Sequence, residues 1–392
     1  MGKLYIEVPL ETTGFFFMED RQRRNKMKKI ITSESVCIGH PDKTCDTIAD
    51  AFLDEALRQD RNSQMAVECA IKDEHLFVYG EATTKAQIDY DRIAREVLAD
   101  VGYDASKFDI TLQISKQSPD INQAVVGAHL NANDQGIVFG YACNDTPEYM
   151  PLPIMLAHKL MQKFNEFRRK NHLYHSDAKS QVSVEYDNDK VKRIDTILIS
   201  VSHDKTLGID TIKSDIMINV IAPVLAEYSQ YDKGDIKMLI NPSGKFTVWG
   251  SYGDSGCVGR KIVVDTYGGV GRVGGGCFSS KNATKVDRSG AYYARYIAKN
   301  IVANGLADKC EVELSFGIGL ARPLSINIET FETNRVPMEK IYEYVCHNFD
   351  TSVENIINEL DLLRPIYKNT ACFGHFGRNE FSWEQIKKTK NN

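Results

Sequence analysis

The order of the predicted secondary-structure elements constrains the fold of this chain more than any other feature. Alternating apolar and polar residues at 65–72 and 75–82 predict a β-hairpin. Apolar residues recur with helical period at 41–57 before the hairpin and at 90–101 after it, and residues 108–115 alternate as a further strand. An order of helix, hairpin, helix and strand favours an α+β unit, in which helices cover one face of a sheet.

The same order recurs twice along the chain. A second round is expected at residues 156–164, 180–186, 194–201, 212–225 and 236–240. A third is expected at residues 289–304, 311–316, 324–330, 338–348 and 353–360. We therefore expect three similar α+β domains related by pseudo-threefold symmetry, each a mixed or antiparallel sheet covered by helices. The expected boundaries are residues 27–125, 126–243 and 244–392.

Composition excludes several classes of protein. A chain of 392 residues is long for one core, and 42% hydrophobic with 26% charged residues is ordinary for a soluble protein. The net charge of -5 argues against a nucleic-acid partner, and no apolar run approaches the ~20 residues of a membrane span. The nine cysteines include no C-x-x-C pair, which favours reduced thiols in a cytoplasmic enzyme over disulfides or a zinc site.

The first 26 residues differ in character from the rest of the chain. Phe15, Phe16 and Phe17 precede a run of basic residues, whereas a signal peptide has its charges before its apolar core. We expect residues 1–26 to be an extension that is either disordered or added by cloning. The folded chain should then begin near Met27.

A glycine-rich stretch at residues 253–289 is the first candidate for chemistry. A loop ending in Arg260 and Lys261 leads into an apolar run at 262–264, which is expected to be a short strand. Two glycine clusters and several cations come after it. Glycine allows close approach of backbone to a ligand, and cations with backbone amides suit a polyphosphate. Asp287 among these cations is explained if the phosphates carry a divalent metal.

The same stretch has a plainer interpretation. Glycine clusters usually mark turns, and lysines beside them are usually solvated. The stretch matches neither the Walker P-loop nor the dinucleotide-binding fingerprint. Taken alone, it leaves both interpretations open.

Residues 39–43, GHPDK, begin the first predicted helix. Pro41 suits the first helical position, so His40 and Asp42 lie at a helix N-terminus, where free amides favour anions. His40 could equally be a simple cap and Asp42 an acid that interacts favourably with the helix dipole.

Five separated segments together resemble the S-adenosylmethionine synthetase (methionine adenosyltransferase) family. They are GHPDK at 39–43, KQSPDINQ at 116–123, DAKSQV at 177–182, GRKIVVDTYGG at 259–269, and GGGCFSSK with KVDRS at 274–289. The resemblance runs from Met27 to about Trp383 and includes GHFGR at 374–378.

The resemblance implies that the methionine sulfur attacks C5′ of ATP and expels triphosphate, which is then hydrolysed to phosphate and pyrophosphate. A thioether carries no proton, so its attack needs no general base. The highly charged leaving group instead requires cations and a divalent metal. The family uses two Mg²⁺ per site and K⁺, and its sites are shared between subunits of a homodimer, often paired into a homotetramer.

The resemblance also assigns roles to individual residues. The catalytic group around the triphosphate would be His40, Lys179, Arg260, Lys261 and Lys281. The rest of the ATP site would be Asp177, Ala178, Lys245, Phe246, Asp254 and Cys277. Methionine would be bound by Glu81, Gln117, Asp134, Asp254 and Lys285. Asp42 and Asp287 would bind Mg²⁺, and Glu68 would bind K⁺.

Two alternative functions remain at this point. A non-catalytic regulatory subunit of the same fold should have lost phosphate or metal ligands, yet every one named above is present. An ATP-dependent phosphotransferase would need a base for its acceptor hydroxyl, and the sequence offers no clear candidate. The gating loop around 117–136 is shorter than in many family members, although it retains Asp134.

Overall fold

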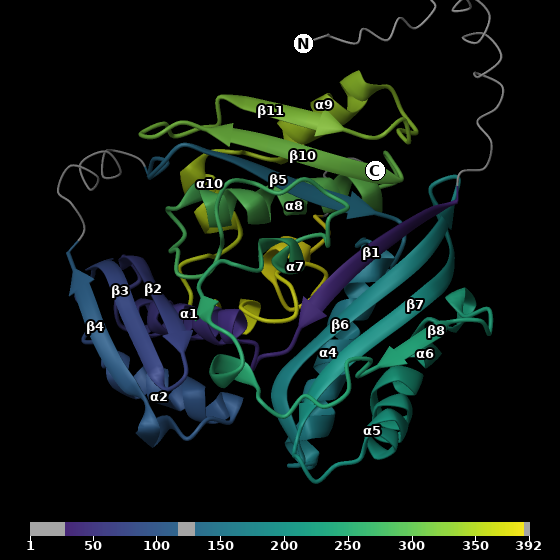
Figure 1. The fold of residues 1–392 in the computed structure, drawn as a ribbon. Coiled ribbons are helices and arrows are strands. Elements are labelled where there is room, and N and C mark those ends of the chain that lie inside the picture. The colour runs from purple at the N-terminus through teal and green to yellow at the C-terminus, as the bar shows by residue number, and fades with distance from the viewer. Residues whose placement is uncertain (1–27, 117–129, 388–392) are drawn as a thin grey trace, which may run out of the picture.

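The computed structural model describes residues 28–116 and 130–387, which form three β-sheets arranged around a common centre (Figure 1). Helices cover the sheets, and the mixed α+β fold class expected from the sequence is confirmed. None of the helices in the described residues is both long and apolar enough to cross a lipid bilayer.

The first sheet contains the predicted hairpin. In spatial order, its strands are β4 (Asp109–Ser115), β3 (His75–Thr83), β2 (Gln64–Lys72) and β9 (Gly256–Cys257). β2 and β3 are antiparallel, and β4 runs parallel to β3. Helices α1 (Pro41–Gln59) and α2 (Tyr90–Val101) bury their apolar stripes in the same core as alternate residues of β2, as the apolar periodicity predicts.

The second sheet repeats this arrangement. In spatial order, its strands are β8 (Lys237–Ile240), β7 (Lys190–His203), β6 (Tyr174–Asp187) and β1 (Lys29–Val36). Asn188 and Asp189 both have positive φ, as a tight hairpin turn between β6 and β7 requires. Helix α4 (Leu152–Lys170) packs against β6 and β1.

The second helix of this domain is not continuous, although one helix was expected at 212–225. It is divided into α5 (Ile209–Ile216), a π-helical turn at Met217–Ile221, and α6 (Ala222–Glu227). Pro223 explains the widened turn, because proline lacks the N–H that a regular helix uses and its ring crowds the preceding turn.

The third sheet is the smallest. Its strands are β11 (Ser325–Glu329), β10 (Lys309–Phe316) and β5 (Gly136–Cys143). Helix α8 (Val286–Ala303) lies directly against β5, where a Cβ added to Gly140 would come within 2.0 Å of the Ala294 backbone. Helices α9 (Met338–Asn348) and α10 (Val353–Glu359) follow the hairpin. Among the described residues no strand comes after α10, so the third round lacks the last strand of the repeated order.

Each sheet takes one strand from a different third of the chain. β1 pairs with β6, β5 pairs with β10, and β9 pairs with β2, all antiparallel. No sheet is therefore built only from one of the contiguous stretches 27–125, 126–243 and 244–392 (Figure 1). The exchange is cyclic, because the first third supplies a strand to the second, the second to the third, and the third to the first.

The prediction of a strand at 262–264 is wrong. This segment is the short helix α7 (Ile262–Asp265), in which Asp265 N–H donates to the Lys261 carbonyl at 2.9 Å. A short apolar run fits a strand or a helical turn equally well. The expected extension at 1–26 lies outside the described residues.

Candidate active site

His40 forms the N-cap of α1. Its Nδ1 accepts a hydrogen bond from the Asp42 backbone N–H at 3.2 Å, and Pro41 occupies the first turn, as expected. Burial, together with Lys261 and Lys179, lowers the pKa of His40 to about 3. The imidazole is therefore neutral and carries its proton on Nε2, which makes it a hydrogen-bond donor beside the cations.

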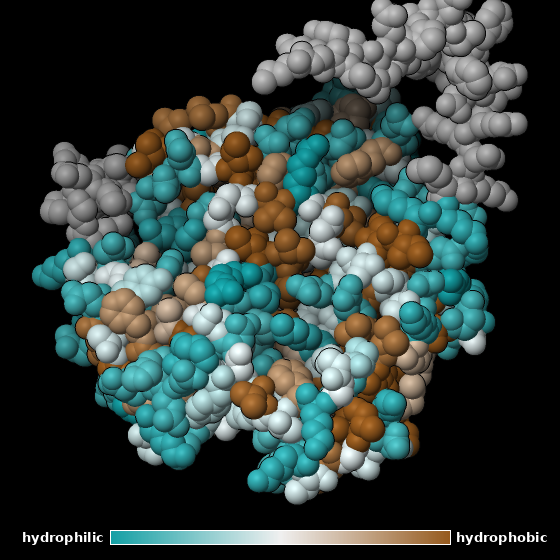
Figure 2. Space-filling model, in the orientation of Figure 1, coloured by the Kyte–Doolittle hydropathy of each residue, from teal (hydrophilic) through white to brown (hydrophobic). Residues whose placement is uncertain are grey.

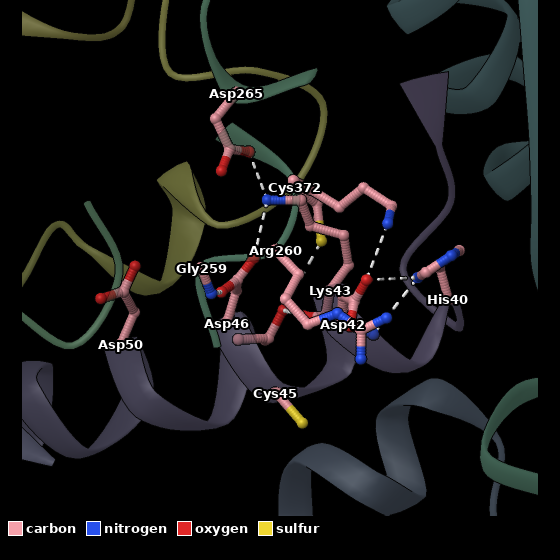
Figure 3. Close-up of polar contacts among 12 residues, drawn as sticks. His40, Asp42, Lys43, Cys45, Asp46, Asp50, Gly259, Arg260, Asp265 and Cys372 are labelled. Atoms are coloured by element: carbon pink, nitrogen blue, oxygen red, sulfur yellow. Dashed lines mark hydrogen bonds and ion pairs between the residues drawn. The ribbon is translucent and has the colours of Figure 1, made fainter. Parts of the chain in front are cut away.

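Asp42 connects this helix end to the glycine-rich stretch. Its carboxylate is buried, and Oδ1 accepts a hydrogen bond from the Cys257 N–H at 3.0 Å. Oδ2 lies 2.7 Å from Lys261 Nζ, and Arg260 Nε is 3.4 Å from Oδ1 (Figure 3). The structure thus brings together two motifs that are far apart in the sequence.

The DAKSQV segment borders the same site from β6. Lys179 is exposed there and contributes to the lowered pKa of His40. Asp177 is buried, and its Oδ2 accepts a hydrogen bond from the Gly250 N–H at 2.9 Å. Burial raises the pKa of Asp177 to about 6, and Asp254 on an exposed loop acts in the same direction. Asp177 is therefore a buried support for the loop that leads to Asp254.

The remaining residues of the expected ATP loops have different surroundings. Ala178 is buried within β6. Phe246 is half-buried, its N–H donates to His203 Nε2 at 3.1 Å, and its carbonyl accepts the His203 N–H at 3.0 Å. Lys245 beside it is exposed.

Lys281 and Asp287 form the second half of the site. Lys281 Nζ lies 2.6 Å from Asp287 Oδ2, and the Lys281 backbone forms an isolated β-bridge with Ala66. A Cβ added to Gly276 would lie 2.2 Å from Asp287 Oδ2. Only glycine therefore leaves room for this carboxylate.

Two of the expected methionine-binding residues, Glu81 and Asp134, lie near a third, Lys285. Burial and the neighbouring Lys281 lower the pKa of Lys285, whereas Glu81 and Asp134 oppose that shift. Both carboxylates are exposed, Glu81 near the end of β3 and Asp134 just before β5. Two members of the set remain. Asp254 lies on the exposed loop near Asp177, and Gln117 lies outside the described residues.

Cys277 lies between the two halves of the site. A Cβ on Gly259 would meet its Sγ at 2.6 Å, so the thiol packs directly against the loop before Arg260. Burial raises the pKa of Cys277 to about 11. The thiol therefore stays protonated near neutral pH, which argues against a reactive thiolate at this position.

The described residues contain no cluster of three or more His, Cys, Asp or Glu side chains that could hold a metal. Asp42 and Asp287 each offer one carboxylate next to a lysine. Magnesium is typically held by one or two carboxylates together with substrate phosphates. These residues therefore fit a Mg²⁺ that arrives with a polyphosphate. Glu68 on β2 is half-buried and accepts a hydrogen bond from Tyr79 at 3.4 Å, so it too offers a single carboxylate.

A row of aspartates on α1 was not predicted from the sequence. Every fourth residue is an aspartate, and all four are buried: Asp42, Asp46, Asp50 and Asp54. Each accepts a backbone N–H from a different residue of the last third of the chain, namely Cys257, Gly259, Ser280 and Tyr367. The spacing was visible in the sequence, but acids at such spacing usually line a solvated helix face.

Comparison with known proteins agrees with this geometry. Family models described as the N-terminal, central and C-terminal domains of S-adenosylmethionine synthetase match residues 28–125, 129–246 and 248–385. The S-adenosylmethionine synthase of Mycoplasma capricolum is 45% identical over 376 residues, which cover 93% of this chain and 97% of that protein. The S-adenosylmethionine synthase of Clostridium botulinum is 46% identical over 385 residues, covering 92% and 98%. The chain belongs to the S-adenosylmethionine synthetase family.

Proposed function

We propose that this chain synthesises S-adenosylmethionine from ATP and L-methionine. The observation that carries the proposal is the contact of Asp42 with Arg260 and Lys261 beside the neutral imidazole of His40. A cationic group built around one buried carboxylate suits a polyphosphate that carries a metal. The sulfur–C5′ bond forms, the C5′–O5′ bond breaks, and its electron pair leaves with the triphosphate.

In this mechanism the protein mainly stabilises the leaving group. His40 Nε2–H donates to an oxygen near the breaking bond, where negative charge increases. Arg260, Lys261, Lys179 and Lys281 neutralise the phosphates, which are afterwards hydrolysed to phosphate and pyrophosphate. Preorganised donors of this kind are usually the largest contribution to catalysis.

Asp42 and Asp287 are proposed to hold two Mg²⁺, and Glu68 to hold K⁺. When bound, Mg²⁺ would neutralise phosphate charge as a Lewis acid. Lys261 and Lys281, which pair with these two carboxylates, would then turn toward the phosphate oxygens.

Methionine is proposed to bind among Glu81, Gln117, Asp134, Asp254 and Lys285. Acids beside a lysine complement the ammonium and carboxylate of an amino acid. The adenine would lie near Lys245 and Phe246, with Asp177, Ala178 and Cys277 lining the rest of the nucleotide site.

A homodimer with shared sites, or a tetramer of two such dimers, is proposed as the active form, in the cytoplasm. Phe77 is 43% exposed and stacks on Tyr79, and both lie on the same face of β3 as Glu81. A partner covering this sheet face would bury Phe77 and enclose the methionine site together. Figure 2 also shows apolar surface in the middle of one molecular face, where α7 and its flanking loops lie.

One assay separates the alternatives. The chain is incubated with ATP, Mg²⁺ and K⁺, with and without methionine. We expect phosphate, pyrophosphate and S-adenosylmethionine in equal amounts, and only when methionine is present. ADP as the main product would indicate a phosphotransferase instead. No product from a folded chain would indicate a regulatory subunit.

A further inference from the structure

A fully buried ionic cluster lies directly behind the proposed triphosphate site. Lys43 Nζ lies 2.9 Å from Asp46 Oδ2 and also forms an ion pair with Asp265 (Figure 3). The three side chains are at most 4% exposed. None of them has a role in the proposed chemistry, yet Lys43 directly follows Asp42 in α1.

The cluster holds both ends of the segment that carries the phosphate-binding cations. On one side, Asp46 Oδ1 accepts the Gly259 N–H at 2.9 Å, immediately before Arg260. On the other, the Asp265 N–H donates to the Lys261 carbonyl at 2.9 Å, and the Asp265 side chain binds Lys43. Arg260 and Lys261 therefore lie between two attached residues, Gly259 and Asp265. Gly259 is bound to Asp46, and both Asp46 and Asp265 pair with the buried ammonium of Lys43.

A purely stabilising role explains this arrangement poorly. Replacing a buried ion pair with apolar groups is often neutral or favourable for stability. Here two carboxylates share one lysine, and burial raises the pKa of Asp265 to about 7 and also raises the pKa of Asp46. The cluster therefore carries more acid than Lys43 neutralises, so one neutral amide should be tolerated in the fold.

We infer that Lys43, Asp46 and Asp265 are positioning residues that set Arg260 and Lys261 against the triphosphate and align them with Asp42 on α1. The inference rests on the proposed function. It predicts that weakening the cluster displaces the cations without removing them. Such misplacement lowers the rate of the chemical step more than it weakens methionine binding.

The test compares Asp265→Asn and Asp46→Asn with Asp54→Asn. Asp54 lies on the same buried face of α1 but accepts its hydrogen bonds from Tyr367 and Lys368, away from the 259–265 segment. Thermal unfolding is measured for each variant. We expect kcat to fall about tenfold or more for the two cluster variants, with the KM for methionine within about twofold. Asp54→Asn should change the unfolding temperature but not kcat.

A second measurement separates positioning from general damage. Lys261→Met is combined with Asp265→Asn, and tripolyphosphate binding without Mg²⁺ is followed by calorimetry. If Asp265 acts through Lys261, the double variant should be no worse than Lys261→Met alone. If Asp265→Asn fails to fold, Asp46→Asn in the same combination decides the question.

The outcomes are distinct. An inactive but folded unsubstituted chain would contradict the proposed function itself. An active chain whose cluster variants behave like Asp54→Asn, or whose effects simply add to that of Lys261→Met, would overturn the positioning role alone.

Discussion

Asp42 illustrates how a single side chain can connect two sequence motifs. Its two oxygens contact the Cys257 N–H and Lys261 Nζ, so the first helix and the glycine-rich stretch share one carboxylate. The family resemblance assigned both motifs to one site, and the contact of Asp42 with Lys261 is a structural observation that the sequence did not predict. The pairing of Lys43 with Asp265 was not predictable, because nothing in the local sequence shows that Asp265 returns to this helix.

Replacing Asp42 with asparagine should nearly abolish turnover. The amide keeps one oxygen for the Cys257 N–H but loses the charge that faces Lys261 and the proposed Mg²⁺. We expect kcat to fall by about 10²-fold or more at saturating Mg²⁺. Asp60→Asn, at the C-cap of the same helix, is the matched control. Near-normal activity of the Asp42 variant would remove this residue from the metal site.

Replacing Glu68 with glutamine should act on K⁺ dependence alone. The neutral amide can still accept the Tyr79 hydroxyl but attracts a cation weakly. We expect the stimulation by K⁺ to disappear while the K⁺-free rate stays within about twofold of the unsubstituted chain. Initial rates measured against KCl, with choline chloride holding ionic strength constant, provide the test. An unchanged K⁺ response would contradict the assignment.

At the scale of elements, α1 is both a core helix and a docking surface. Its apolar stripe was predicted correctly, as was its start at Pro41. Its row of buried aspartates was not, because a sequence does not reveal which N–H groups arrive from elsewhere in the chain. The same limit explains the segment 262–264, where only tertiary surroundings decide between strand and helix.

The helix also predicts a pH dependence of stability. Burial raises the pKa of Asp54 to about 6 from an ordinary value of 3.8, although hydrogen bonds from Lys368 and Tyr367 oppose the shift. The folded state thus binds this proton more tightly than the unfolded state. The contribution of Asp54 is therefore most favourable at low pH and declines as pH rises between about 4 and 6.

Urea unfolding of the unsubstituted chain and of Asp54→Asn across this range provides the measurement. The unfolding free energy of the unsubstituted chain minus that of Asp54→Asn should fall by up to about 3 kcal/mol as pH rises. A difference that does not change with pH would show that Asp54 titrates normally.

At the scale of the whole molecule, the three sheets are joined by exchanged strands. The number and order of the hairpins were predictable from alternation. The exchange was not, because β1, β5 and β9 carry no local mark of the strand that each will pair with. The expected domain boundaries after residues 125 and 243 therefore do not mark the limits of the sheets, and they remain predictions.

The exchange predicts that the molecule unfolds as one unit. Calorimetry should show a single transition whose calorimetric and van't Hoff enthalpies agree for the folding unit. Residues 28–125 alone should not fold stably, because β1 lacks β6 and the acidic face of α1 lacks its partners. Separate transitions for the three thirds would contradict this expectation.

The cyclic exchange also has a consequence for synthesis on the ribosome. The first sheet is complete only when Gly256 and Cys257 have been translated, and α1 has partners as far along the chain as Cys372. The earliest of the described helices therefore waits for nearly the entire chain, with its buried carboxylates exposed to water until then. Native structure in the first third should consequently form late in translation, which makes the nascent chain dependent on protection during elongation.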